Sequence, residues 1–154
     1  MSPLEGAGMS PLRGLAQPRF HRSRRSSSWN RSGANADRVP LPAGETIALA
    51  DIDGAGCVVH IWMTIGSVDL LFPRKLVLRM YWDGQEHPSV ESPLGDFFGA
   101  GHGTLSHYVS LPFNIISRFD PIGRRHRAAL NCFLPMPFSR GARITLRLGS
   151  ICCW

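Results

Sequence analysis

The stretch Lys75-Leu76-Val77-Leu78-Arg79-Met80-Tyr81-Trp82, followed by Asp83-Gly84, decides the fold. Side chains alternate between the two faces of an extended strand, so one face here collects the large apolar residues Leu76, Leu78, Met80 and Trp82. Asp-Gly is a strong tight-turn signal, because both residues tolerate positive φ. The stretch therefore predicts a strand that packs one face against a core and ends in a tight turn.

Three further stretches, residues 46–50, 57–65 and 142–148, also predict strands. The second is β-branched and aromatic with glycine on both sides, so we expect it to be buried on both faces. In the third, Ile144, Leu146 and Leu148 are expected to face inward. No convincing 3.6-residue apolar period occurs. Short strands joined by Gly- and Pro-containing turns predict an all-β sandwich.

The composition fits one globular domain, with 154 residues, 44% hydrophobic and 18% charged. Basic residues gather at the start of the chain, at Arg13, Arg19, Arg22, Arg24, Arg25, Arg31 and Arg38. We expect a basic N-terminal arm at 1–26, a sandwich at 27–148 and an atypical tail at 149–154. The arm has no interleaved aromatics beyond Phe20 and no nucleic-acid fold after it, which favours a solvated arm over a nucleic-acid partner.

The four cysteines, Cys57, Cys132, Cys152 and Cys153, form no C-x-x-C pair. Cys57 and Cys132 sit in apolar runs, so we expect buried free thiols, a reducing compartment and a cytoplasmic location. His102 and His107 lack the spacing of a zinc site, so neither a metal nor a cofactor is expected. No apolar run approaches the length of a membrane span, so no membrane partner is expected.

Five segments carry a family resemblance through their sequences and their order in the chain. They lie at residues 28–37, 54–62, 78–84, 88–99 and 131–138. The first reads Ser28-Trp29-Asn30-Arg31-Ser32-Gly33-Ala34-Asn35-Ala36-Asp37, and the fourth contains Glu91-Ser92-Pro93-Leu94-Gly95-Asp96-Phe97-Phe98-Gly99. Together they resemble the N-terminal half of proteins with the domain of unknown function 2961, also classed as glycoside hydrolase family 172. The resemblance covers roughly residues 10–146.

The resemblance implies a jelly-roll β-sandwich, trimer-based homo-oligomers, and retaining hydrolysis of fructofuranose or arabinofuranose glycosides by two glutamates. Those glutamates lie in the family's second jelly roll, one near a Gly-Thr-Glu-Asp-Tyr-type motif that this sequence lacks. Residues 147–154 also depart from the family pattern. We therefore expect an incomplete first jelly roll, truncated and inactive alone. The alternative is a non-catalytic carbohydrate-binding or assembly module.

Within this chain, Glu91 and Asp96 are the plausible pair of catalytic carboxylates, because a retaining mechanism needs two such groups about 5–5.5 Å apart. They stand in a glycine-rich stretch that ends at His102-Gly103. The competing interpretation is that Asp96 braces its own loop through backbone N–H groups.

Sugar contacts are expected from two other places. In the first segment, Trp29 offers an apolar ring, while Arg31, Asn35 and Asp37 offer directed hydrogen bonds; a self-bonded turn with Trp29 in the core is the alternative. His60 and Trp62 share one face of a predicted strand, where a buried neutral histidine is the alternative. Phe98 is a further candidate platform, although such a ring is more often core.

Overall fold

The computed structural model describes residues 18, 20–122 and 124–149. In this part of the chain, two helices and one 3-10 turn interrupt a series of strands: α1 (Phe72–Lys75), α2 (Leu94–Phe97) and η1 (Gly101–Gly103). The strands are β1 (Thr46–Asp53), β2 (Gly56–Val58), β3 (Ile61–Ser67), β4 (Leu76–Trp82), β5 (Val90–Pro93), β6 (Tyr108–Val109), β7 (Phe113–Asp120), β8 (Arg125–Cys132), β9 (Met136–Phe138) and β10 (Gly141–Leu148).

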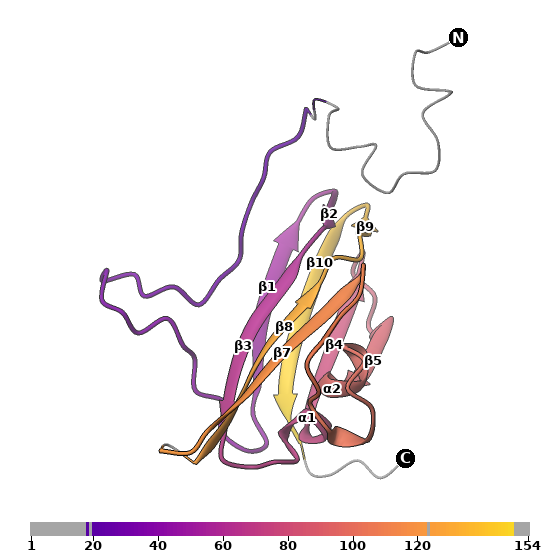
Figure 1. Cartoon of the computed structure of the whole chain (residues 1–154). Helices are drawn as coiled ribbons and strands as arrows, with labels where there is room; N and C mark the ends of the chain where they lie inside the picture. Colours follow the sequence, from indigo (N-terminus) through magenta and orange to yellow (C-terminus); the bar gives the residue numbers. More distant parts are fainter. Residues whose placement is uncertain (1–17, 19, 123, 150–154) are drawn as a thin grey trace.

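Two four-stranded antiparallel sheets form the body, with strand orders β1-β10-β4-β5 and β3-β8-β7-β6, and β2 pairs with β9 in a small ribbon. Figure 1 shows the two sheets as the layers of a sandwich, with the ribbon at one end and the β7–β8 hairpin at the other. The predicted all-β sandwich is confirmed.

The core lies between the two sheets. On β4 and β10, Leu78 stands opposite Leu146 and Met80 opposite Ile144, so their side chains share the inner face. From the other sheet, Ile115 and Leu130 meet them, and these residues are buried. The alternation predicted for residues 75–82 and 142–148 is confirmed, because large apolar side chains gain most free energy from burial between the layers.

The interpretation of residues 57–65 as one strand buried on both faces is wrong. β2 ends at Val58, and a new strand, β3, begins at Ile61. Along β3, half-buried and exposed residues alternate, because an antiparallel sheet of a sandwich covers one face and leaves the other to solvent. Cys57 is exposed rather than buried, whereas Cys132 is buried, and burial raises the pKa of its thiol.

One side of the sandwich is covered where the chain passes from β5 to β6. There α1, α2 and η1 pack together, and Leu94 and Phe98 have no exposed surface. The approach of the two helices requires glycine at position 95, since a Cβ there would lie 2.7 Å from Pro73 Cβ. The other side is formed by β1 and β3, which are edge strands of their sheets.

The β2–β9 ribbon closes one end of the sandwich. Phe138 stacks against Trp82 with ring centroids 6.2 Å apart and is almost fully buried. Gly56 lies over the same ring, and a Cβ on it would come within 2.7 Å of Phe138 Cζ. The ribbon therefore holds Phe138 against Trp82 at this end of the sandwich.

Residues 20–45 form neither helix nor strand and are almost all exposed, although Leu41 packs against the core. Much of the segment lies outside the two sheets in Figure 1. Ser26 Oγ donates to the Leu49 carbonyl on β1 at 2.6 Å. Most of the expected arm (residues 1–17 and 19) and most of the expected tail (150–154) lie outside the described residues.

Candidate functional site

Glu91 lies on β5 directly opposite Arg79 on β4, and Arg79 Nε donates to its Oε2 at 2.6 Å. That hydrogen bond from the guanidinium lowers the pKa of Glu91 below its ordinary value. A general acid in glycoside hydrolysis needs a raised pKa so that it still carries a proton near neutral pH. The environment of Glu91 thus opposes an acid role.

Asp96, on α2, forms an ion pair with Arg74 of α1. Its other oxygen, Oδ1, is buried and accepts no hydrogen bond from the described residues. Asp96 therefore braces two short helices through an arginine side chain, rather than through the backbone N–H groups expected. Glu91 and Asp96 thus each form an ion pair with a different arginine.

The loop at 28–37 is the self-bonded turn expected. Asp37 Oδ1 accepts from the Asn30 backbone N–H at 2.6 Å, and Ser28 Oγ donates to the Asp37 carbonyl at 2.9 Å. Trp29 is not core: it is 52% exposed, and the Arg31 guanidinium lies 5.5 Å from its ring centroid. Asp37 thus shapes the loop, which presents Trp29 with Arg31, and Asn35 is exposed on it.

A connected group of polar and aromatic side chains occupies the outer face of the β3-β8-β7-β6 sheet. Trp62, Asn131 and Asn114 stand in one row across β3, β8 and β7. Trp62 is 62% exposed. Asn131 Nδ2 donates to Asn114 Oδ1 at 2.8 Å, so the two amides hold each other in a fixed orientation. We call this row, with His60 and Phe133, the Trp62 face.

His60 joins this face from the segment just before β3. Its Nε2 lies 3.0 Å from Asn131 Oδ1, and its ring stacks on Phe133 with centroids 4.6 Å apart and planes 7° apart. A carbonyl oxygen can only accept, so His60 Nε2 donates. The buried-histidine alternative is wrong, because His60 is exposed. The structure thus brings together His60 and Trp62 as the sequence suggested.

Asn131, Asn114 and Phe133 were not predicted as site residues. Asparagine is depleted in strands, and Asn114 and Asn131 lie outside every stretch that was predicted as a strand, so no signal in the sequence pointed to these two residues. Their meeting depends on the register of β7 against β8, which local sequence patterns do not report.

Phe98 lies in the core and not on a binding surface. It has no exposed surface and makes edge contacts with Phe97 and Phe113, at centroid distances of 5.0 and 6.1 Å. The single turn of α2 directs both phenylalanines of the pair toward the interior, whereas an extended segment would have separated them. The expected contact between Phe98 and a sugar does not fit this position.

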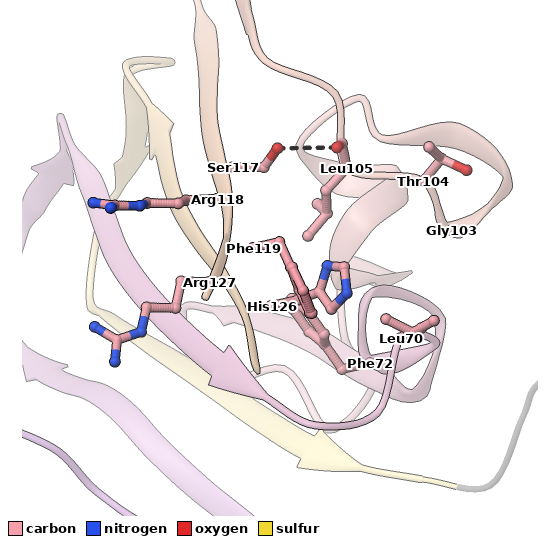
Figure 2. Close-up of a pocket in the computed structure, with 10 residues that line it drawn as sticks. All are labelled: Leu70, Phe72, Gly103, Thr104, Leu105, Ser117, Arg118, Phe119, His126 and Arg127. Carbon is pink, nitrogen blue, oxygen red and sulfur yellow. Dashed lines mark hydrogen bonds between the residues drawn. The ribbon is translucent and has the colours of Figure 1, made fainter. Parts of the chain in front are cut away.

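A pocket of about 350 Å³ opens beside the β7–β8 hairpin (Figure 2). His126 and Phe119 point into it, with ring centroids 4.8 Å apart, while Arg118 and Arg127 point away. Ser117 Oγ donates to the Leu105 carbonyl at 3.0 Å on its wall. None of its lining residues is Asp or Glu, so the pocket offers no carboxylates for hydrolysis.

Within residues 18, 20–122 and 124–149, no group of three or more His, Cys, Asp and Glu side chains is placed to hold a metal ion. Nor does any helix of this part have the length and apolar character needed to cross a membrane.

The family model described as GH172 domain-like matches residues 32–150. The chain therefore belongs to this glycoside hydrolase-related family, and the resemblance inferred from the five segments is confirmed. No curated protein matches the chain.

Proposed function

We propose that this chain is the carbohydrate-binding β-sandwich of a glycoside hydrolase-type protein, and that it binds furanosides of the fructofuranose or arabinofuranose class without hydrolysing them by itself. One observation carries the proposal: the Trp62 face joins an exposed indole to an orientated pair of amides and an imidazole.

This combination matches the chemistry of a sugar. An indole covers the apolar C–H side of a sugar ring, while amide and imidazole groups exchange hydrogen bonds with hydroxyls. Asn131 and Asn114 are already held by their mutual hydrogen bond and by His60, so little side-chain entropy remains to be lost when a hydroxyl binds. Phe133, stacked on His60, extends the aromatic surface.

The absence of hydrolysis follows from the carboxylates. Glu91 is held ionised by Arg79, and Asp96 is paired with Arg74. Glu91, with its lowered pKa, does not suit the protonated acid that a retaining mechanism requires beside its nucleophile, and the carboxylate of Asp96 is engaged by Arg74. Trp29 and Arg31 provide a further candidate contact surface, with Asn35 on the same loop and Asp37 shaping it. The jelly-roll topology and the trimer-based assembly are part of the proposal on the strength of the family alone.

Isothermal titration of the chain with arabinofuranosides and fructofuranosides tests the binding proposal. We expect saturable binding that Trp62→Ala weakens by at least about tenfold, equivalent to about 1.4 kcal/mol. Ile122→Ala, an exposed apolar residue on the β7–β8 hairpin, serves as the control and should bind as the unmodified chain does. Absence of binding to every furanoside, or unchanged binding by Trp62→Ala, would contradict the proposal.

An aryl arabinofuranoside assay tests the absence of turnover. We expect no release of the aryl group. Turnover that disappears in Glu91→Gln would show that this chain carries its own catalytic carboxylate.

A further inference from the structure

The outer face of the β3-β8-β7-β6 sheet continues from the Trp62 face toward the β7–β8 hairpin. Cross-strand pairing defines two further rows on it, Thr64–Ala129–Ile116 and Gly66–Arg127–Arg118. The two arginines extend to the same side of the sheet, away from the pocket (Figure 2). Arg127 lies four residues before Asn131 on β8, and a strand rises about 3.3 Å per residue, so the arginines and the amides are about 13 Å apart. One sheet face therefore carries aromatic and amide groups at one end and paired guanidinium groups at the other.

The positive charge at the hairpin end is only partly offset within the chain. Arg118 and Arg127 stand directly opposite each other, and like charges in such a cross-strand pair repel. Arg127 Nη2 donates to Asp120 Oδ2 at 3.1 Å, whereas Arg118 is exposed and has no ion pair among the residues that the structure describes. Arg125, opposite Asp120, is a third exposed arginine at this end. An anion bound here would relieve the repulsion between the guanidinium groups.

We propose that the ligand of the Trp62 face is an acidic oligosaccharide, with a furanose ring on Trp62 and a carboxylate or phosphate group bound by Arg118 and Arg127. This inference rests on the proposed function and names its ligand class more closely. Guanidinium groups recognise carboxylates and phosphates through paired, charge-assisted hydrogen bonds. The two ends of the site are about 13 Å apart, which is longer than one furanose ring. The acid group therefore belongs to a different unit of the ligand from the ring that covers Trp62.

The row between the two ends favours a glycan over a nucleic acid. Thr64, Ala129 and Ile116 carry no charge, and Ile116 is 52% exposed, so it offers an apolar surface to the C–H groups of a bridging sugar unit. A single-stranded nucleic acid has a phosphate on every unit, and proteins that bind one follow its backbone with positive charge. An uncharged row followed by two arginines instead fits a chain whose acid group lies at one end.

A matched pair of ligands isolates the contribution of the acid group. The reducing end of an arabinofuranose trisaccharide is either reduced to a neutral alditol or oxidised to a carboxylate, so the two forms differ mainly in charge. Isothermal titration of the full chain at about 0.01 M ionic strength should show the carboxylate form binding at least about fivefold more tightly than the alditol. This preference should shrink at about 1 M, where exposed charges are screened. The same trisaccharide with a phosphate monoester shows which acid group binds more tightly.

Variants of exposed residues connect the preference to this face. Arg118→Gln leaves the ion pair of Asp120 with Arg127 in place and should reduce the preference for the carboxylate form to less than about twofold. Arg147→Gln removes the same charge from an exposed position on β10, in the other sheet, and as the matched control should keep the full preference. Trp62→Ala should weaken the binding of both forms, because ring and acid belong to one ligand. Circular dichroism confirms that each variant is folded.

Equal binding of the two forms by the unmodified chain would overturn the inference and leave the proposed function standing. The inference is also overturned if Arg118→Gln keeps the full preference, if Arg147→Gln loses it equally, or if Trp62→Ala binds the carboxylate form as before. A single-stranded DNA oligonucleotide that binds more tightly than the carboxylate form would overturn it in favour of a nucleic acid. If neither form binds, the proposed binding of arabinofuranosides is rejected together with this inference.

Discussion

The two sides of this sandwich are formed by the same two sheets, but only one side is covered by connecting segments. Between β5 and β6, α2 and η1 pack with α1, which comes from the connection of β3 to β4, and there Leu94 and Phe98 are fully buried. Where β1 and β3 lie, the inward residues Met63 and Ile65 stay half-buried. The difference shows that short connecting segments, rather than the strands themselves, decide whether the inward residues at a side of the sandwich become fully buried or stay half-buried.

The largest expected effect is a difference in the cost of removing equivalent apolar side chains. Leu94→Ala, on the covered side, should lower the free energy of unfolding by about 2–5 kcal/mol, because it leaves a cavity. Ile65→Ala, on the β3 side, should cost about half of that or less, because its side chain is already partly hydrated.

Urea unfolding of the two variants measures both free-energy changes. Equal costs at the two positions would show that the β3 side is as well packed as the covered side, and the comparison would fail.

A smaller loss of stability is expected from a substitution at the close contact between α1 and α2. Gly95→Ala places a Cβ 2.7 Å from Pro73 Cβ and 3.2 Å from two backbone oxygens, so α1 and α2 must separate. We expect a loss of about 1–3 kcal/mol in unfolding free energy. Gly101→Ala, where nothing lies within 4 Å, is the control and should unfold almost as the unmodified chain does. A tolerated Gly95→Ala would mean that the helix contact contributes little.

The smallest expected effect is the loss of folding stability at low pH. On the covered side, the Lys75 side chain donates to Asp69 at 2.5 Å and lowers the pKa of that carboxyl, as Arg79 does for Glu91. A carboxyl with a lowered folded-state pKa stabilises the fold above its unfolded value of about 4, and this contribution is lost as the pH falls through the folded-state pKa.

The thermal unfolding temperature should therefore change little near neutral pH and fall below about pH 4. A double variant, Asp69→Asn with Glu91→Gln, should be less stable at neutral pH and lose less on acidification. Parallel pH curves for the two proteins would assign acid sensitivity to other groups.

Local patterns predicted those features of the fold that depend on neighbours in sequence. The alternation of residues 75–82 predicted β4, and Asp83-Gly84 forms the tight turn expected, with both φ angles positive at 57° and 79° and Gln85 N–H donating to the Trp82 carbonyl at 3.0 Å. The one-turn helices α1 and α2 were not predicted, because four residues are too few to show a helical period.

The sequence predicted only part of the candidate site, because local patterns report only residues that are close in the chain. Trp62 and His60 were found because they are neighbours in the chain. Asn131 is joined to His60 only by the pairing of β3 with β8, and the edge position of β3 is set by the order of strands in its sheet. Pairing order depends on contacts between distant segments, so no local window of sequence reports it.

The ribbon that seats Phe138 makes the two ends of the sandwich unequal. At the ribbon end, the Phe138 ring fills the space beside Gly56 and Trp82. The hollow by the β7–β8 hairpin, at the opposite end, reaches Phe72 of the interior. We therefore expect apolar probes such as xenon to enter this protein at the hairpin end.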